Sequence, residues 1–401
     1  MTATPYTITV PDEKLKQLRA KLDLTTLPDE LDDAGWEYGA PLAEVKRLVE
    51  YWKDGYDWRK HEADLNNELP QFIQSITVEG HGALDIHYVH KTSTVVSAIP
   101  LLFVHGWPGS IIEARKILPL LTAASPDHPS FHVVAFSLPG YGFSEAPTKK
   151  GFRLQQYAEV GHKLMLALGY NEYVTQGGDW GALITRKISL DYGQKHVKAW
   201  HTNMPIFGQP PHPLYQPVSF ISNALTPYTA GEKTSIQRRQ WFRQIGSGYF
   251  AEQSTQPQTL GYSLADSPAG LLAWIYEKLV NWTDEYPWTD DEVLTWISIY
   301  WFSRAGPAAS VRIYFEITQA GESTTASPKV PIGLSYFPRE IGGVPRQWNR
   351  NGANVVFEGE HERGGHFAAF ERPEDLVGDL HKMFGKGGRA FGAVPGKTGY
   401  D

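Results

Sequence analysis

Cysteine is absent from the 401-residue chain, which excludes a disulfide framework, thiolate catalysis and a cysteine-based zinc site. Long apolar runs are missing as well: no segment is long enough to span a bilayer, and the first 18 residues lack the apolar core of a signal peptide. Positive charge is not in excess, because the formal net charge is −7, and this argues against nucleic-acid binding. We therefore expect a cytoplasmic protein without a signal peptide or membrane anchor.

Aromatic residues, by contrast, are numerous, with 13 Trp and 20 Tyr. Some of them can line an apolar pocket, although most are expected in the core. Hydrophobic residues make up 41% of the chain and charged residues 20%, which is typical of a globular protein with a large core. The length fits one large α/β domain with insertions, or two domains.

Strand and helix patterns alternate along much of the chain, which predicts a mainly parallel sheet flanked by helices. The predicted strands cover residues 75–78, 84–90, 99–104, 132–136, 173–176, 197–202, 330–337 and 354–358. We divide the chain into an N-terminal helical and irregular segment, the first half of the core, a helical lid, the second half of the core and a glycine-rich tail, at residues 1–95, 96–205, 206–328, 329–384 and 385–401. The composition of the tail predicts a flexible or loosely tethered end.

One short motif, Gly177–Gly181, has the sequence Gly-Gly-Asp-Trp-Gly. It has the pattern of a nucleophile elbow, a sharp turn from a strand into a helix, in which small residues avoid clashes beside the central nucleophile. The central residue is Asp179, where esterases have Ser. A carboxylate does not form an ordinary acyl-enzyme from an ester, but it can attack a saturated carbon and form an alkyl ester.

A second motif, His105–Gly109, follows a predicted strand ahead of the elbow. In enzymes with a nucleophile elbow, the loop after an early strand donates one backbone N–H to the oxyanion hole, and the residue after the nucleophile donates the other. We expect these donors to be the amides of Trp107 and Trp180.

A third motif, Arg363–Phe367, lies between the last predicted strand and the last predicted helix and contains His366. Histidine can take a proton from water near neutral pH, and the order nucleophile, acid, histidine fits this architecture. The acid must then lie between the lid and His366. The residues alone leave four candidates open, with a modest preference for the first because it follows the end of a strand: Glu340, Glu358, Glu360 and Glu362.

Two further patterns are rejected. Ser144 lies in a Gly-x-Ser-x-Ala string that resembles a serine elbow, but the residues after it cannot begin a helix. His361 and Glu362 precede His366 in a way that resembles a zinc motif, but the histidines are five residues apart and Gly364 and Gly365 intervene. The two rings would not share a helical face, so we reject a zinc site. We expect no metal and no organic cofactor.

Taken in order, the strings His-Gly-Trp-Pro-Gly, Gly-Gly-Asp-Trp-Gly and Arg-Gly-Gly-His-Phe-Ala-Ala-Phe-Glu resemble those of epoxide hydrolases of the α/β-hydrolase superfamily. The resemblance is strongest to the microsomal-type branch, including its soluble fungal members, and covers nearly the whole chain. It implies an α/β-hydrolase fold with a helical lid and an N-terminal meander. It also implies that Asp179 is the nucleophile, His366 the base and Glu340 the acid that orients it.

The same resemblance implies two lid tyrosines that bind the epoxide oxygen. They match Tyr249, in the segment Ser247–Tyr249, and Tyr314, in the segment Val311–Glu316. The reaction expected from these residues converts an epoxide to a vicinal diol through a hydroxyalkyl ester on Asp179, which water activated by His366 then hydrolyses. Its partners would be an epoxide and water, and a homodimer is one possible assembly.

Two alternatives are kept. A haloalkane dehalogenase shares the Asp elbow and the covalent ester, and Trp107 and Trp180 could serve as its halide-binding donors. A binding or sensor protein could reuse this fold, although such proteins usually lose part of the triad, and all three members are present here. The dehalogenase does not require the two lid tyrosines.

Overall fold

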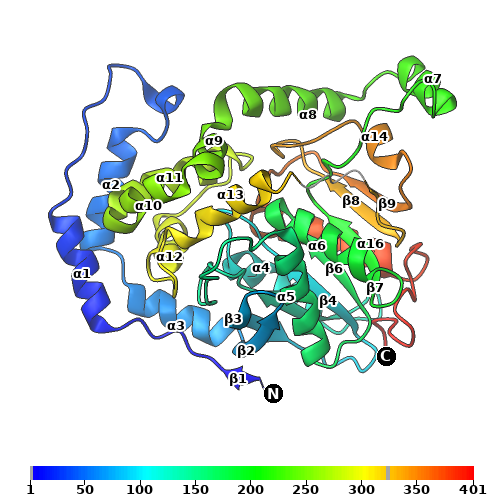
Figure 1. Cartoon of the computed structure of the whole chain (residues 1–401), viewed down its shortest axis with the longest axis horizontal. Coiled ribbons are helices and arrows are strands. Elements are labelled where there is room, and N and C mark those ends of the chain that lie inside the picture. Colours follow the sequence, from blue (N-terminus) through cyan, green and yellow to red (C-terminus); the bar gives the residue numbers. More distant parts are fainter. Residues whose placement is uncertain (1–2, 322–325) are drawn as a thin grey trace.

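The computed structural model describes residues 3–321 and 326–401. A nine-stranded sheet crosses the molecule in the order β1-β2-β3-β5-β4-β6-β7-β8-β9 (Figure 1). The strands β4 to β9 pair in parallel, whereas β1, β2 and β3 form an antiparallel edge. Their bounds are Thr4–Pro5, Gln71–Val78, Gly82–Lys91, Ile99–Val104, Phe131–Phe136, Tyr173–Gly177, Val197–Thr202, Ile332–Tyr336 and Val355–Glu360.

Helices cover both faces of this sheet. On one face, α5 (Leu154–Ala167) packs against α6 (Asp179–Tyr192), and α6 lies along β4, β6 and β7. On the other face, α4 (Ala114–Thr122) packs against α15 (Ala368–Glu371) and α16 (Pro373–Phe384). The central strands are buried on both faces, as the near-continuous apolar run of β4 requires. The predicted α/β-hydrolase-type core is therefore observed.

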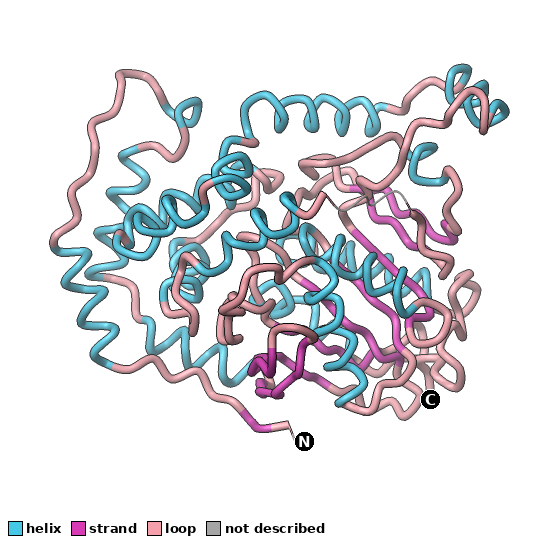
Figure 2. The backbone as a smooth tube through the Cα atoms, viewed as in Figure 1, coloured by secondary structure: helices cyan, strands magenta, loops and turns pink. Residues whose placement is uncertain are grey.

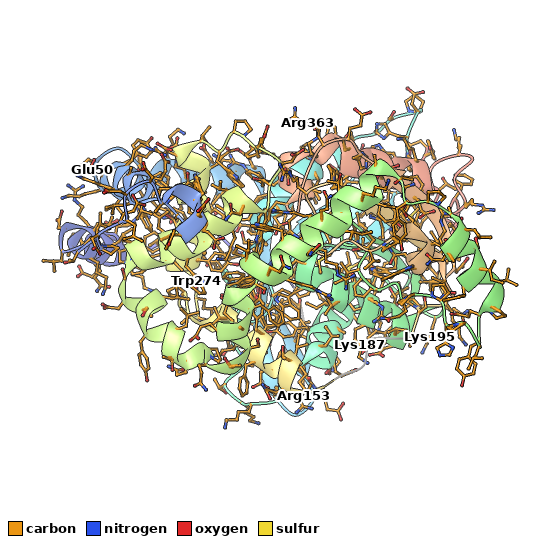
Figure 3. All side chains as sticks on the ribbon, turned by 90° about the horizontal axis from the view of Figure 1, so that it is seen from above. Glu50, Arg153, Lys187, Lys195, Trp274 and Arg363 are labelled. Carbon is orange, nitrogen blue, oxygen red and sulfur yellow. The ribbon has the colours of Figure 1, made fainter. Side chains whose placement is uncertain are left out.

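The segment between β7 and β8 forms the lid over the carboxyl ends of the strands. Figure 2 shows it as helices joined by loops, above the strands, and Figure 3 shows its side chains from above, with Trp274 on α11. Residues 322–325 of the predicted lid, like residues 1–2 of the predicted N-terminal segment, lie outside the described residues. The lid helices are α7 to α13, at Pro217–Leu225, Ala230–Trp241, Gly248–Thr255, Pro257–Asp266, Pro268–Asn281, Asp290–Trp301 and Arg312–Gln319.

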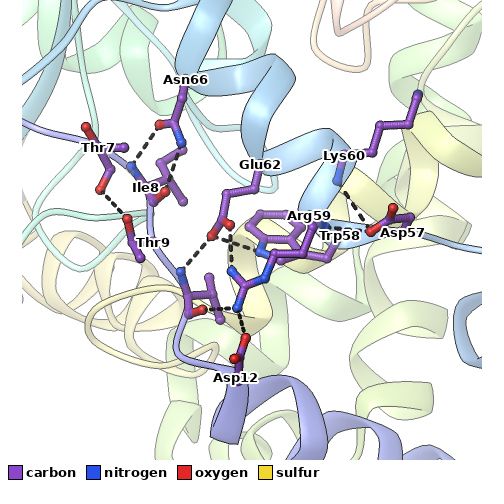
Figure 4. A network of polar contacts seen from close by, with 11 residues as sticks. Thr7, Ile8, Thr9, Asp12, Asp57, Trp58, Arg59, Lys60, Glu62 and Asn66 are labelled. Carbon is purple, nitrogen blue, oxygen red and sulfur yellow. Dashed lines mark hydrogen bonds and ion pairs between the residues drawn. The ribbon is translucent and has the colours of Figure 1, made fainter.

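The N-terminal segment packs against the lid. Its helices α1 (Asp12–Asp23) and α2 (Leu42–Asp54) contact α11, and α3 (Trp58–Glu68) contacts α12. A buried carboxylate on α3 fixes the chain that enters α1: Glu62 accepts hydrogen bonds from the Val10 backbone and the Trp58 indole, and it pairs with Arg59 (Figure 4). The segment thus supports the outer side of the lid.

The sequence patterns missed β1 and α3, and the interpretation of the tail as loosely tethered was wrong. Val394 and Tyr400 are buried, and the backbone of Gly399 exchanges hydrogen bonds with Ser97 and Ser130, ahead of β4 and β5. Gly399 and three other tail glycines have positive φ, which lets the chain turn tightly and pack back on the core. The glycines of the tail therefore form tight turns and do not make the tail loosely tethered.

Candidate active site

Asp179 lies at the sharp turn between β6 and α6, with a φ of 49°. Few residues other than glycine adopt this conformation, and such strain is held only where the surroundings impose it. Its neighbours must be glycine: a Cβ on Gly181 would lie 1.9 Å from the Val104 carbonyl oxygen, and one on Gly106 would lie 2.1 Å from Oδ1 of Asp179. The elbow geometry predicted from Gly177–Gly181 is observed.

The loop after β4 brings a hydrogen-bond donor to this carboxylate. The backbone N–H of Trp107 donates to Oδ1 of Asp179 at 2.7 Å. Trp180 occupies the second position of α6, at the helix end where backbone N–H groups point outward and carry partial positive charge. The first expected donor is therefore in contact with Asp179, and the roles of both amides in an oxyanion hole stay predictions.

The same loop is held from two sides. His105 is buried, and burial lowers its pKa to about 4, so its ring is neutral. Its Nε2 accepts from the Leu138 backbone and its Nδ1 faces the Gly106 carbonyl at 2.9 Å. From the lid helix α12, the Trp296 indole donates to the Pro108 carbonyl and the Tyr300 hydroxyl donates to the Gly109 carbonyl.

His366 joins the nucleophile to one of the four candidate acids. Its Nε2 lies 3.2 Å from Oδ2 of Asp179, and its Nδ1 lies 2.9 and 3.0 Å from the two carboxylate oxygens of Glu340. Burial alone would lower the pKa of His366, but the carboxylates of Glu340 and Asp179 raise it well above the ordinary value. The resting site therefore favours an imidazolium between two carboxylates.

Two of the other candidate acids have different partners. Glu358 pairs with Arg350 and accepts a hydrogen bond from the Tyr336 hydroxyl at 3.0 Å. Glu360 pairs with Arg346. Among the four candidates, Glu340 is the one that bonds to the histidine, and its role as the orienting acid stays a prediction.

Residues that the sequence patterns did not reveal fix the loop that carries His366. The His366 backbone N–H donates to the Trp282 carbonyl at 2.8 Å, and Gly364 donates to Asp284. The buried carboxylate of Glu371 accepts from the backbone of Gly365 at 2.8 Å. No local motif marks Trp282 and Asp284, because they lie on the lid, about 80 residues before the histidine. Glu371, by contrast, is the last residue of the motif string that begins at Arg363.

An apolar cavity of about 380 Å³ opens above Asp179 and contains both predicted tyrosines. Tyr249 and Tyr314 are buried, with ring centroids 5.8 Å apart, and each ring also packs against Trp107. Among the described residues, the Tyr314 hydroxyl has no hydrogen-bond partner. Burial raises the pKa of both phenols well above 10, so both keep the proton they could donate. Apolar lining includes Leu183, Met204, Ile206, Phe242, Phe250, Ile317 and Ile341.

Ser144 and His361, the central residues of the two rejected patterns, bond to residues outside the candidate active site. The Ser144 hydroxyl is buried and donates to the Ser137 carbonyl at 2.6 Å. His361 bonds to Asp379 at 2.7 Å and stacks on Phe337, whereas His366 pairs with Glu340. In the part of the chain that the structure describes, no hydrogen bond joins Ser144 or His361 to Asp179.

The comparison with known proteins agrees with this geometry. Residues 3–114 match the family model of the epoxide hydrolase N terminus, and residues 99–262 match the α/β hydrolase fold. Epoxide hydrolase 1 of Sus scrofa is 35% identical over 412 residues, covering 95% of this chain and 88% of that protein. The chain belongs to the epoxide hydrolase family. The resemblance seen in the three motifs is thereby confirmed.

Solved structures show the same relationship across the lid and the core. The epoxide hydrolase of Aspergillus niger has a TM-score of 0.82 at 35% identity and is covered over 95% of both chains. The juvenile hormone epoxide hydrolase of the silkworm Bombyx mori has a TM-score of 0.83 at 30% identity, covering 94% of this chain and 93% of that one. The activity is therefore hydrolysis of epoxides, and the haloalkane dehalogenase alternative is not favoured.

Among the helices of the described residues, none is long and apolar enough to cross a membrane.

Proposed function

We propose that Asp179, His366 and Glu340 hydrolyse an epoxide in two steps, with Tyr249 and Tyr314 as proton donors. In the first step, the epoxide lies in the apolar cavity and its oxygen accepts hydrogen bonds from the two phenols. Asp179 attacks a ring carbon through its carboxylate, the ring C–O bond breaks, and a tyrosine protonates the oxygen that leaves. Asp179 then carries a hydroxyalkyl ester.

In the second step, the ester is hydrolysed. Alkylation removes the negative charge of Asp179, and one of the interactions that raise the pKa of His366 is lost. The imidazolium gives up its proton, which restores the tyrosine deprotonated in the first step. The neutral imidazole, still oriented by Glu340, then takes a proton from water, and the water oxygen attacks Cγ of Asp179. The amides of Trp107 and Trp180 stabilise the oxyanion, an effect worth about 3 kcal/mol per donor at comparable sites. The diol leaves and Asp179 is restored.

The proposal rests mainly on the position of Asp179 between two chemically different groups of residues. The apolar cavity with its two phenols lies on one side, and His366 with Glu340 lies on the other. A volume of about 380 Å³ with aromatic lining suits a bulky aryl or alkyl epoxide. The cytoplasmic location, the absence of a cofactor and the homodimer stay predictions of the sequence.

A single-turnover reaction with styrene oxide in ¹⁸O-labelled water tests the covalent step. We expect the label in the side chain of Asp179 and none in the first diol released, because water attacks Cγ and the original carboxylate oxygen leaves with the product. Label in the diol and none in Asp179 would contradict the proposal and indicate direct attack by water. A chloroalkane serves as the comparison substrate, and its faster turnover would favour the dehalogenase.

The variant His366→Gln separates the two steps. We expect normal formation of the ester and its accumulation, visible as added mass on the intact protein, because no base remains to activate water. The matched control is His196→Gln, a half-buried histidine whose Nδ1 faces the Asn171 carbonyl. If no ester forms in His366→Gln while the control is active, His366 does not act in the second step alone.

A further inference from the structure

A second, much smaller cavity lies against Asp179, apart from the apolar one. Its volume is about 10 Å³, and four polar side chains face it: Glu113, Asp179, Asn203 and His366. Much of the remaining wall is glycine backbone, at Gly106, Gly109 and Gly178. A cavity of this size and polarity is about that of one water molecule, which needs two to four polar partners.

Glu113 has no part in the two steps described so far. It ends the short helix Ile111–Glu113, which directly follows the His105–Gly109 loop, and it is 9% exposed. A Cβ on Gly109 would lie 1.8 Å from Oε1 of Glu113, so the carboxyl group packs directly on the backbone of the loop. Burial raises its pKa to about 8, and the charges of His366 and Asp179 act on it as well.

We propose that Glu113 and His366 together hold the hydrolytic water in this small cavity. The inference rests on the proposed function, because it requires an ester on Asp179 as the group that this water attacks. One hydrogen of the water points to Nε2 of His366, and a carboxyl oxygen of Glu113 accepts the other. With both hydrogens engaged, a lone pair of the water oxygen remains to face Cγ of Asp179.

The step balances with these groups alone. His366 takes one proton from the water as the water oxygen bonds to Cγ, while Glu113 keeps its hydrogen bond to the remaining O–H. The tetrahedral intermediate collapses by breaking the bond between Cγ and the alkyl oxygen. The alkyl oxygen takes the proton from His366 and leaves as the second hydroxyl of the diol.

The arrangement also explains why water and substrate need not compete for space. The epoxide occupies the apolar cavity on the lid side, where Asp179 meets Tyr249 and Tyr314. The water occupies the polar cavity beside His366 and the strand ends. Glu113 then acts only after the ester has formed, which gives it a kinetic signature distinct from that of the tyrosines.

A purely structural role for Glu113 makes a different prediction. Its carboxyl group accepts a hydrogen bond from the Ser110 backbone and lies on the loop that presents the Trp107 amide. If Glu113 only supported this loop, its loss would displace Trp107 from Asp179 and slow both steps. A residue that holds the water affects the second step alone.

The test compares Glu113→Gln and Glu113→Leu with the wild-type chain in single-turnover experiments with styrene oxide. Intact mass measured at short times gives the rates of ester formation and ester decay separately. Glu159→Gln, a buried glutamate on α5 away from the site, is the matched control and should match the wild type in both rates. Circular dichroism verifies folding.

We expect equal rates of ester formation in all four proteins. Ester decay should slow by about tenfold or more in Glu113→Leu, which loses the acceptor, and by less in Glu113→Gln, whose amide oxygen can still accept. Decay within twofold of the wild type in Glu113→Leu, or ester formation that falls in step with decay, would overturn the proposal. If the Leu variant does not fold, Glu113→Gln decides: its ester must form at the wild-type rate and decay more slowly than that of the wild type, and an unchanged rate of decay would overturn the proposal. If the wild type forms no ester at all, the proposed function fails instead.

Discussion

The backbone amide of Trp107 holds Oδ1 of Asp179 at 2.7 Å, in the elbow that fixes this carboxylate. The other oxygen, Oδ2, faces His366 at 3.2 Å. The two oxygens of one carboxylate therefore have different surroundings before any substrate binds. In the proposed mechanism, Oδ1 is the oxygen on which the oxyanion develops. Such pre-organisation requires no rearrangement at the moment of reaction, and this is where most catalytic stabilisation arises.

Glu340→Gln should lower activity by up to about 10⁴-fold, the loss seen when the acid of a comparable triad is neutralised. The amide no longer raises the pKa of His366 or fixes the orientation of its ring. Glu358→Gln, the matched control, breaks the pair with Arg350 and should leave activity within about twofold. Steady-state turnover of styrene oxide checks both. Equal losses in the two variants would mean that Glu340 acts through stability alone.

Tyr249→Phe and Tyr314→Phe should each slow ester formation and leave ester decay unchanged. Each change removes one donor to the epoxide oxygen while keeping the packing of the ring, and we expect a loss of about tenfold to a hundredfold in the first step. The double variant should lose more than either single one. Stopped-flow measurement of the first step checks this, with Tyr262→Phe at an exposed lid position as the control. Slowed ester decay in either variant would contradict the assignment.

Gly181→Ala should destabilise the fold, because its Cβ would lie 1.9 Å from the Val104 carbonyl oxygen in a strand that cannot move without disrupting the sheet. We expect a loss of about 1–3 kcal/mol in the free energy of unfolding, as for overpacking elsewhere in proteins. Gly378→Ala is the matched control, since it also lies in a helix but its Cβ would meet no atom within 4 Å. It should be neutral or slightly stabilising. Thermal unfolding of both variants gives the comparison.

The parts of the site that lie in contiguous motifs were predictable from the sequence. Glycines mark the elbow around Asp179 and the loop of His366, because a side chain at these positions would clash with nearby atoms. No local motif separates Glu340 from Glu358. The two differ in the basic residue that folding brings beside them, which is His366 for Glu340 and Arg350 for Glu358. Tyr249 and Tyr314 could be chosen among 20 tyrosines only through the family resemblance.

Features of the site that depend on residues far apart in sequence are not marked by any sequence motif. Glu113 belongs to no sequence motif. It becomes a candidate only in the structure, where residues far apart in sequence enclose it. The tail was misjudged for a related reason. Its glycines suggest freedom when read as composition, whereas the burial of Val394 and Tyr400 depends on the core surface that they meet.

Lys278 on α11 should make the stability of the lid depend on pH. Burial lowers its pKa from 10.5 to about 7, and its ammonium lies 5.2 Å from the centre of the Tyr249 ring. Between pH 7 and 10.5 the unfolded chain therefore binds more protons at this residue than the folded chain does, so the contribution of Lys278 to stability rises with pH across this window. Below pH 7 both states carry the charge, and the folded state bears the full cost of burying it.

Lys278→Met removes this dependence while keeping most of the side-chain volume. The melting temperature of the variant should exceed that of the wild type most at pH 6 to 7, and the difference should shrink as the pH is raised toward 10. Lys187→Met is the control and should show no such trend, because Lys187 pairs with Asp191 on α6 and its side chain stays 25% exposed. A difference that stays constant or grows with pH would mean that Lys278 keeps its charge within the fold, stabilised by its neighbour Glu277.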